Sequence, residues 1–394
     1  MDKILKAMPA VFILFGLGAC ISEPFARNCV RILFLIFFAM LWQKKYSLSD
    51  FVHYKKILLL MAAFMAWLMI SYVWGGMTIP PNDDAIEWVI YNQDMFIFLL
   101  LGIMIREEKV LAGILIALTF SLLIDDVYIF YQAAQGVDRP ITFLHGSFMQ
   151  STMLYLVLLP TFLVMTLKDG EVIAGKLFYG LSFLVSLAAF LMINTRGAWL
   201  ALAIVLAFIL AFRLRSRKKI CAAALVLVVM FGVFLMASPK TFDRLATFAN
   251  VTSEQSVSER FLMWKSAVHV IEDNPLMGVG FGNYEAAYQN KYILAEAKER
   301  FQGHTHNVYL QFWAETGLPG LILFCALFGY ILYWSWRRAD NCYGLIIFSS
   351  TLGLMLYGLT DYTISSFSAM RVYWLVFAVC VVGIKFTERK SFSV

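Results

Sequence analysis

Two histidines close together in this chain could supply a general base. His304 and His306 precede Asn307 and an apolar stretch that ends at Gly317 and Pro319, so we expect a helix to begin near Asn307. The positive end of a helix disfavours a protonated imidazole, and only a neutral imidazole can accept a proton from a hydroxyl group. An isolated histidine is more often a structural residue with a hydrogen bond, and His304 competes with His306 for the role. These residues alone therefore do not decide whether either histidine is a general base, or which of the two it would be.

Arginines in or beside apolar sequence could bind a phosphate group. Arg196 lies in a very short connection between two apolar stretches, Arg139 lies in another connection, and Arg260 lies in the first turn of a predicted amphipathic helix. A guanidinium near a membrane is costly unless it is paired or functional, and its planar fork matches phosphate oxygens. A lipid-headgroup anchor is the alternative for Arg196, and an inert surface position is the alternative for Arg260.

Acidic residues are sparse in the apolar sequence, and two of them lie at or near the predicted membrane depth. These are Asp94 and Asp361, each of which could pair with an arginine. The sequence shows no group of Asp, Glu or His with the spacing of metal ligands, so we expect no obligatory metal.

The composition indicates that a membrane surrounds these residues. Of 394 residues, 61% are hydrophobic and 15% are charged, and the mean hydropathy is +0.74, whereas a soluble domain has about 25% charged residues. A bilayer core about 30 Å thick takes about 20 apolar residues per helix. We therefore predict an all-α polytopic membrane protein of about twelve transmembrane helices surrounded by membrane lipids. The net charge of +6 would favour nucleic acid in a soluble protein, but we expect no nucleic acid here, because the positive-inside rule explains most basic residues.

The predicted spans leave a single long connection. They cover residues 7–22, 29–42, 57–74, 88–105, 110–131, 149–167, 174–193, 197–212, 220–237, 318–336, 343–359 and 372–386. Basic clusters in alternate connections place both termini in the cytoplasm. We predict helices 1–9 over residues 1–237, an external helical loop over 238–317, and helices 10–12 with a cytoplasmic tail over 318–394, all in one integrated membrane domain.

The first part of the long loop is predicted to be an amphipathic helix. Ser256 and Glu259 form a possible capping box, and Asn274 followed by Pro275 ends the apolar-periodic run. The glycine-rich turn over 275–282 follows no strand, so we reject nucleotide binding and expect a tight bend.

A second helix is predicted over residues 283–300. It places Tyr284, Tyr288 and Tyr292 at helical spacing, facing sugar rings or lipid headgroups.

These residues resemble the O-antigen ligase family, which belongs to a larger group with O-antigen polymerases and bacterial O-linked oligosaccharyltransferases. The family signature is His followed by Asn, Ser or Gln, then nine residues, then Gly-x-x-Gly, Thr or Tyr. An arginine motif, Arg-x-x-x-Leu, lies at the outer end of a span. The residues that meet the two motifs are His306, Asn307, Gly317 and Gly320 for the first and Arg196 and Leu200 for the second. Twelve spans with one large loop between the ninth and tenth also agree with the family.

The resemblance implies transfer of an O-antigen glycan from undecaprenyl diphosphate to a sugar hydroxyl of lipid A core in lipopolysaccharide biosynthesis. The reaction would take place at the periplasmic face of the bacterial inner membrane, with inversion at the anomeric carbon and without metal or cofactor. Such a donor is already activated, so no nucleotide is needed. His306 would act as the base with Asp361 orienting its ring, and Arg196 and Arg260, with Arg139 as a weaker third, would bind the donor diphosphate.

Two alternatives remain from the sequence. An O-antigen polymerase or an O-linked oligosaccharyltransferase would use the same donor, and the two motifs do not separate these branches. A secondary transporter or flippase is the alternative of a different class. Transporters often contain internal repeats with paired broken helices, and this sequence shows no clear two-half repeat.

Overall fold

The computed structural model describes most of the predicted membrane helices and the second part of the long loop. The described residues are 2–43, 54–77, 92–214 apart from 106 and 145, the single positions 216, 218, 221 and 232, and 255–391 apart from 299 and 302. Every regular element in these ranges is helical, and eight of their helices are long and apolar enough to cross a membrane. The all-α class is confirmed within this part of the chain. Apart from the single positions 221 and 232, the predicted span over 220–237 and the loop residues 238–254 lie outside it, so the count of twelve stays a prediction.

The long apolar helices lie close to their predicted positions. They are α2 (Glu23–Trp42), α3 (Lys55–Gly76), α6 (Glu108–Ala134), α7 (Phe148–Thr166), α8 (Ile173–Met192), α9 (Arg196–Leu214), α14 (Val308–Trp336) and α16 (Phe367–Ser391). Two shorter apolar helices, α1 (Asp2–Gly18) and α15 (Cys342–Tyr357), belong to the same bundle. α7 and α16 are almost completely buried in it.

The predicted span over 88–105 differs from the structure in its described part. A short 3-10 helix, η2 (Asn92–Phe96), leads into α5 (Ile97–Met104), so residues 92–104 do not form one regular helix. Asp94 lies in the 3-10 turn, where its carboxylate accepts a hydrogen bond from the buried guanidinium of Arg371. The predicted pairing of Asp94 with an arginine is therefore confirmed.

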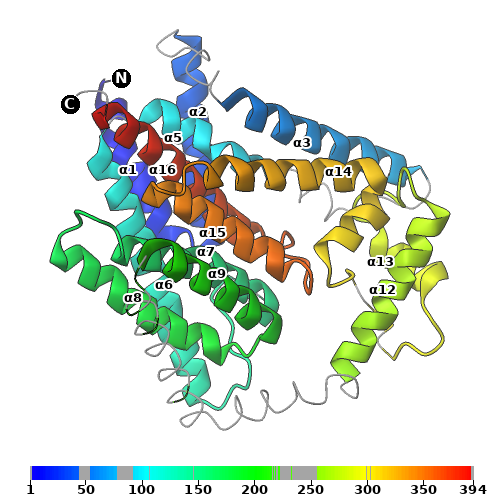
Figure 1. The fold of residues 1–394 in the computed structure, drawn as a ribbon. Helices are drawn as coiled ribbons and strands as arrows, with labels where there is room; N and C mark the ends of the chain where they lie inside the picture. The colour runs from blue at the N-terminus through cyan, green and yellow to red at the C-terminus, as the bar shows by residue number, and fades with distance from the viewer. Residues whose placement is uncertain are drawn as a thin grey trace.

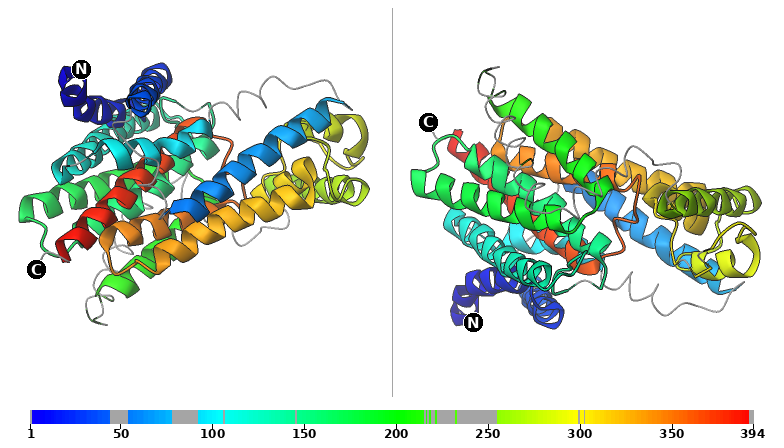
Figure 2. Two further views of the ribbon diagram at one scale, coloured as in Figure 1. Left: turned by 90° about the horizontal axis from the view of Figure 1, so that it is seen from above. Right: turned by 90° about the horizontal axis from the view of Figure 1, so that it is seen from below.

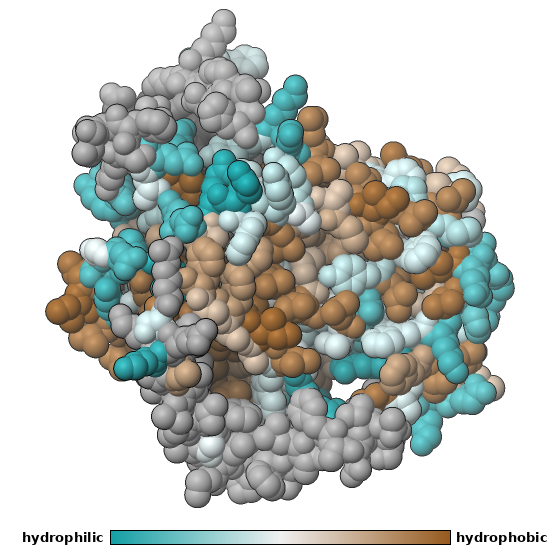
Figure 3. Space-filling view, viewed as in Figure 1, coloured by the Kyte–Doolittle hydropathy of each residue, from teal (hydrophilic) through white to brown (hydrophobic). Residues whose placement is uncertain are grey.

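The bundle has a broad apolar surface and one polar end. Hydrophobic residues gather over the middle of the face shown in Figure 3, and hydrophilic residues gather toward its right-hand edge. That edge is where α12 (Gln255–Asp273) and α13 (Tyr284–Ala287) lie, beyond the ends of α3 and α14 (Figure 1). α1 begins and α16 ends on the opposite side of the bundle (Figure 2). This distribution suits a lipid-facing belt with a polar unit at one end.

The loop helices differ from the prediction in two ways. Ser256 lies within α12, whose first described residue is Gln255, and the carboxylate of Glu259 accepts the N–H of Lys298 at 3.2 Å. The predicted helix over 283–300 is also too long. α13 has four residues and passes into a π turn, η4 (Tyr288–Tyr292), after which the chain is irregular.

The three tyrosines of this segment do not face sugars or headgroups. Tyr284 and Tyr288 are completely buried, and Tyr292 is 9% exposed. They pack against the apolar face of α12, in a small core that includes Met263 and Val270. An amphipathic helix needs a cover for its apolar face, and the tyrosine side of the following segment provides it, which is why the prediction was wrong.

The glycine-rich turn and a kink in α14 join the loop to the bundle. Gly278, Gly280 and Gly282 have positive φ angles of 66°, 98° and 83°, which confirms the predicted bend. α14 contains a non-helical residue, Gly317, at φ 69°, so the predicted helix stop is a kink within one long element. A Cβ atom on Gly317 would lie 2.0 Å from the carbonyl oxygen of Leu276.

The kink exposes carbonyl groups that would otherwise bond within the helix. The carbonyl of Ala314 accepts the N–H of Val279 at 3.0 Å, and that of Glu315 accepts the N–H of Gly280 at 2.8 Å. The indole of Trp67 in α3 donates to the carbonyl of Thr316 at 2.9 Å. Buried backbone groups need such partners, so the kink fixes the loop turn and α3 against α14.

Candidate active site

His306 lies immediately before α14, where the next residue caps the helix. The side-chain oxygen of Asn307 accepts the N–H groups of Tyr309 and Leu310 at 3.0 and 3.1 Å. Its amide nitrogen donates to the carbonyl of Leu359 at 3.1 Å, which ties the start of α14 to the connection between α15 and α16. Asn307 therefore holds the position from which His306 extends.

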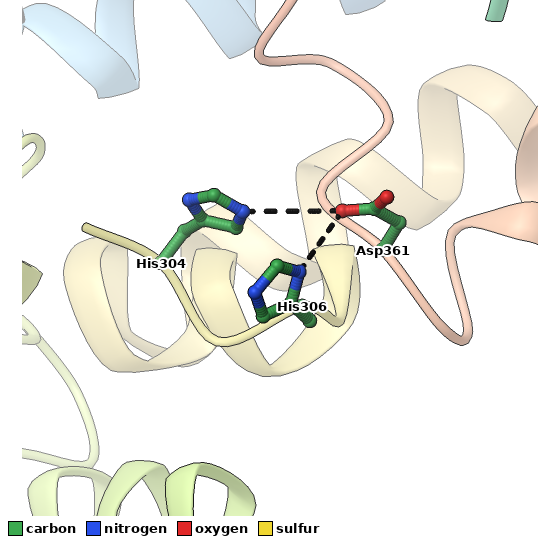
Figure 4. Close-up of side chains that lie close together, drawn as sticks. All are labelled: His304, His306 and Asp361. Atoms are coloured by element: carbon green, nitrogen blue, oxygen red, sulfur yellow. Dashed lines mark hydrogen bonds and ion pairs between the residues drawn. The ribbon is translucent and has the colours of Figure 1, made fainter. Parts of the chain in front are cut away.

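Asp361 meets His306 from the connection between α15 and α16 (Figure 4). Its Oδ1 lies 3.2 Å from Nδ1 of His306 and accepts the N–H of Tyr362 at 2.8 Å. Its Oδ2 accepts the hydroxyl of Tyr357 at 2.6 Å. A carboxylate at Nδ1 favours the tautomer with the proton on that nitrogen, so Nε2 of His306 is left as a proton acceptor.

The pKa of Asp361 is lowered although the side chain is buried. Burial disfavours its charge, but the hydrogen bond from His306 and the electrostatic effect of the two imidazole rings outweigh this cost. Within the described residues, Asp361 thus pairs with His306.

His304 shares the same carboxylate, which the sequence did not predict. Its Nε2 lies 3.9 Å from Oδ1 of Asp361, and its ring centroid lies 4.3 Å from that of His306. Partial burial and the neighbouring His306, with a further contribution from Arg260, lower the pKa of His304 to about 4. His304 is therefore neutral at physiological pH. The spacing of two histidines in His-x-His was the sequence feature that could have indicated a role for His304. Only the fold shows that both imidazole rings lie near the carboxylate of Asp361.

The three side chains could in principle hold a metal ion. Their potential ligand atoms all lie within 4.8 Å of one another. Both oxygens of Asp361 already accept hydrogen bonds, and the charge of Arg260 acts on His304. This geometry fits an imidazole oriented by a carboxylate better than a closed metal centre.

Arg196 begins α9 beside this histidine–aspartate group. A Cβ atom on the next residue, Gly197, would lie 2.4 Å from Oγ1 of Thr360 and 3.6 Å from the ring of Tyr357. The start of α9 is therefore packed against the connection that carries Asp361.

The other two predicted arginines also lie around the site. The side chain of Asn194 donates to the carbonyl of Asp138 at 3.1 Å, which joins the segment of Arg139 to the turn that precedes α9. The charges of Arg139 and Arg260 both act on Tyr357. Arg139 and Arg260, from separate parts of the chain, therefore contribute positive charge near Tyr357, whose hydroxyl contacts Asp361.

Two residues at this site have strained backbones. Among the described non-glycine residues, Asn194 and His306 have positive φ angles, 59° and 50°. Such strain costs about 1–3 kcal/mol and concentrates at functional sites. Its location supports this region as the functional centre.

The remaining motif residues do not join the site. Leu200 is 62% exposed on α9, on the surface available to lipid. Gly317 forms the kink of α14, and Gly320 permits the close approach of Trp67, whose Cδ1 would lie 3.1 Å from an added Cβ. These glycines shape the element that carries His306.

Comparisons with known proteins agree with this geometry. Residues 181–325 match the model of a family described as O-antigen ligase, a range that includes Arg196, Arg260 and His306. An uncharacterized protein of Haemophilus influenzae is 24% identical over 260 residues, and the alignment covers 61% of this chain and 64% of that relative. The chain thus spans less than two thirds of the relative's length.

Proposed function

We propose that this protein, which carries an O-antigen ligase family domain at residues 181–325, transfers O-antigen glycan from undecaprenyl diphosphate to a sugar hydroxyl of lipid A core. The observation that carries the proposal is the His306–Asp361 pair, with the start of α9 at Arg196 packed against the same connection and the charges of Arg139 and Arg260 acting on Tyr357. A proton acceptor near groups able to bind phosphate supports the proposal. A lipid-diphosphate donor and a hydroxyl acceptor need this combination.

In the proposed reaction, His306 activates the acceptor. Asp361 holds the proton on Nδ1, so Nε2 accepts the proton of the acceptor hydroxyl while the hydroxyl oxygen attacks the anomeric carbon of the donor sugar. The new glycosidic bond forms as the bond from that carbon to the diphosphate oxygen breaks. Attack from the face opposite the leaving group inverts the anomeric configuration.

The arginines would stabilise the leaving group. The departing undecaprenyl diphosphate keeps the electron pair of the broken bond, and rigid guanidinium groups neutralise such charge strongly in a partly desolvated site. Arg196 and Arg260 are the primary groups in this role and Arg139 is the third. The donor supplies the driving force for transfer, so the mechanism uses neither a nucleotide nor a metal ion.

We propose that the site faces the periplasm from the bacterial inner membrane. Basic connections on the opposite side support this orientation, as does the location of α12 and α13 at the end of the bundle away from the start of α1 and the end of α16 (Figure 1).

A deletion strain separates a ligase from a polymerase. Loss of a ligase should leave lipid A core without O-antigen while finished polymer accumulates on undecaprenyl diphosphate. Loss of a polymerase should instead leave cores that carry a single repeat. Gel profiles of lipopolysaccharide from the deletion strain would contradict the ligase assignment if they showed single-repeat cores.

A further inference from the structure

The connection between α6 and α7 folds back along α6 and does not simply cross the end of the bundle. We call residues 135–144 the α6–α7 arm. The side chain of Gln132 accepts the N–H of Ile141 at 3.2 Å and donates to its carbonyl at 2.7 Å. Two residues further on, the ring of Phe143 stacks on Tyr128, with centroids 4.2 Å apart and an interplanar angle of 12°. The arm therefore runs antiparallel to α6 along one of its faces.

Asp125 is the deepest point of contact between the arm and α6. Its Oδ1 accepts the N–H of Phe143 at 2.9 Å, and its side chain is completely buried. Asp125, Tyr128 and Gln132 are spaced as one face of a helix. At 1.5 Å per residue, Asp125 lies about 10 Å further along α6 than Gln132. The arm is thus anchored well inside the bundle.

α7 holds the arm from the other side. The N–H and the hydroxyl of Thr142 lie 3.0 and 3.1 Å from Oγ of Ser151, and Thr142 is 1% exposed. With α6 on one side and α7 on the other, the backbone of residues 141–143 has a fixed register.

The two adjacent carboxyls in α6 serve different partners. Asp126 accepts hydrogen bonds from Tyr155 in α7 at 2.7 Å and from Ser186 in α8 at 2.6 Å, so it joins three helices of the bundle. Asp125 turns to the arm, and its Oδ2 has no hydrogen-bond partner within the described residues. Burial of a carboxyl in an apolar bundle is costly. The hydrogen bond between Asp125 and the N–H of Phe143 in the arm offsets part of this cost.

The arm carries Arg139 to the candidate active site. Its guanidinium lies 4.3 Å above the ring of Phe148, and its charge acts on Tyr357. The carbonyl of the preceding residue, Asp138, is held by Asn194 in the turn before α9. A shift in the register of the arm would therefore move Arg139 relative to this turn.

We propose that Asp125 is a positioning residue, which fixes the α6–α7 arm and through it places Arg139 against the diphosphate of the donor. The proposal deepens the proposed function and rests on it for the identity of the ligand. Asp125 lies too deep in the bundle to reach the donor itself. Its effect on transfer must therefore pass entirely through the arm.

The structural half of the proposal can be tested by hydrogen–deuterium exchange of the full chain in nanodiscs. Asp125→Leu removes the acceptor for the N–H of Phe143, whereas Asp125→Asn keeps an acceptor oxygen at that place. We expect faster exchange over residues 135–144 in Asp125→Leu and wild-type exchange in Asp125→Asn. Gln132→Leu removes the two hydrogen bonds to Ile141 at a half-buried position and should also speed exchange over the arm. This variant replaces Asp125→Leu in the experiment if Asp125→Leu does not fold. Gln135→Leu is the matched control, because Gln135 is the C-cap residue at the junction of α6 and the arm and its side chain is exposed.

The functional half can be tested by combining variants. We expect Asp125→Leu to raise the KM for the lipid-diphosphate donor by up to about tenfold, the upper range for loss of one hydrogen bond, with a smaller change in kcat. In an Arg139→Ala background the same substitution should have no further effect on transfer. An unchanged exchange rate over the arm in both Asp125→Leu and Gln132→Leu overturns the proposal. So does an equal loss of transfer in both backgrounds.

A failure of the proposed function would be visible separately. If the wild-type chain transfers no glycan, binding of undecaprenyl diphosphate to the same variants replaces the transfer assay. Weaker binding by Asp125→Leu and Arg139→Ala, with wild-type binding by Gln135→Leu, supports the positioning role. Wild-type binding by all three variants overturns it.

Discussion

Asp361 determines which nitrogen of His306 can act. The carboxylate accepts from the hydroxyl of Tyr357 and the N–H of Tyr362, so its position is fixed before His306 contacts it. Its contact at Nδ1 leaves Nε2 of His306 as the proton acceptor. An oriented imidazole loses no freedom when the acceptor arrives, which is the usual advantage of a preorganised base.

Substitution of His306 by alanine should abolish transfer without loss of the fold. A general base contributes about 10²- to 10⁴-fold to a rate, so we expect His306→Ala to lower kcat by about that factor in purified protein. His269→Ala is the matched control, because His269 is an exposed histidine on α12. Glycan transfer to lipid A core is the measurement, with the wild type assayed with and without EDTA. Full activity of His306→Ala would contradict its role as base, and loss of wild-type activity in EDTA would contradict the metal-free mechanism.

His304 should make the stability of the protein depend on pH. Its pKa is about 4 in the folded chain and about 6.5 in an unfolded chain. Between these values the unfolded chain binds more protons, so the free energy of unfolding falls as the pH is lowered from about 6.5 toward 4. Asp361 has a lowered folded pKa, so its contribution is lost only at a pH below about 4.

The measurement for His304 is the midpoint of thermal unfolding at pH 7.5 and pH 5. We expect the wild-type midpoint to fall more between the two than that of His304→Gln, which cannot titrate. Equal shifts in both proteins would show that His304 does not contribute.

The sequence predicted single site residues better than their contacts. His306, Asn307 and the arginines could be selected by type and spacing, and the structure adds Asp361 at Nδ1 of His306 and packs the start of α9 against the connection that carries Asp361. The role of His304 depends on the carboxylate of Asp361, which lies in a connection distant in the sequence. A local sequence pattern cannot show that the two residues are close in space. The tyrosines of the loop were assigned to the surface because helical spacing alone cannot show which face another helix covers.

At the scale of elements, the kink in α14 connects the helix that follows His306 to the glycine-rich turn and to α3. The carbonyl groups released at Gly317 bind the glycine-rich turn and α3, while the N-terminus of the same element follows His306 directly. The sequence indicated a helix stop there. It could not indicate that the helix resumes at once, because the kink depends on hydrogen bonds from segments distant in the chain.

Gly317→Ala should therefore destabilise the protein and reduce transfer. Its φ angle of 69° is unfavourable for alanine, and the new Cβ would lie 2.0 Å from the carbonyl oxygen of Leu276. We expect a loss of about 1–3 kcal/mol in the free energy of unfolding. Gly329→Ala in the same helix is the control, because no atom lies within 4 Å of its added Cβ, and it should be neutral or slightly stabilising. Similar unfolding midpoints for the two variants would show that the kink is not required.

At the scale of the whole molecule, the site is built from the ends of several helices. His306 precedes α14, Asp361 follows α15, Arg196 begins α9, and Arg260 lies in α12. The ends of membrane helices lie toward the border of a bilayer, where the proposed lipid-linked diphosphate would also lie. A gated transporter would need a path through the bundle between two such borders, whereas the proposed glycan transfer needs a site at one border only.

The proposed orientation can be tested with two exposed positions that the positive-inside rule places on opposite sides of the membrane. Leu276 is 63% exposed in the glycine-rich turn, and Val172 is 67% exposed in the connection between α7 and α8. The positive-inside rule places Val172, beside Lys168 and Lys176, in the cytoplasm and Leu276 outside. In a cysteine-free background, a membrane-impermeant maleimide should label Leu276→Cys in intact spheroplasts, and Val172→Cys only after lysis. Because a lipid-linked donor and a lipid A acceptor must meet on one side of the membrane, labelling of Val172→Cys in intact spheroplasts would place the histidines on the cytoplasmic side and would contradict the periplasmic reaction.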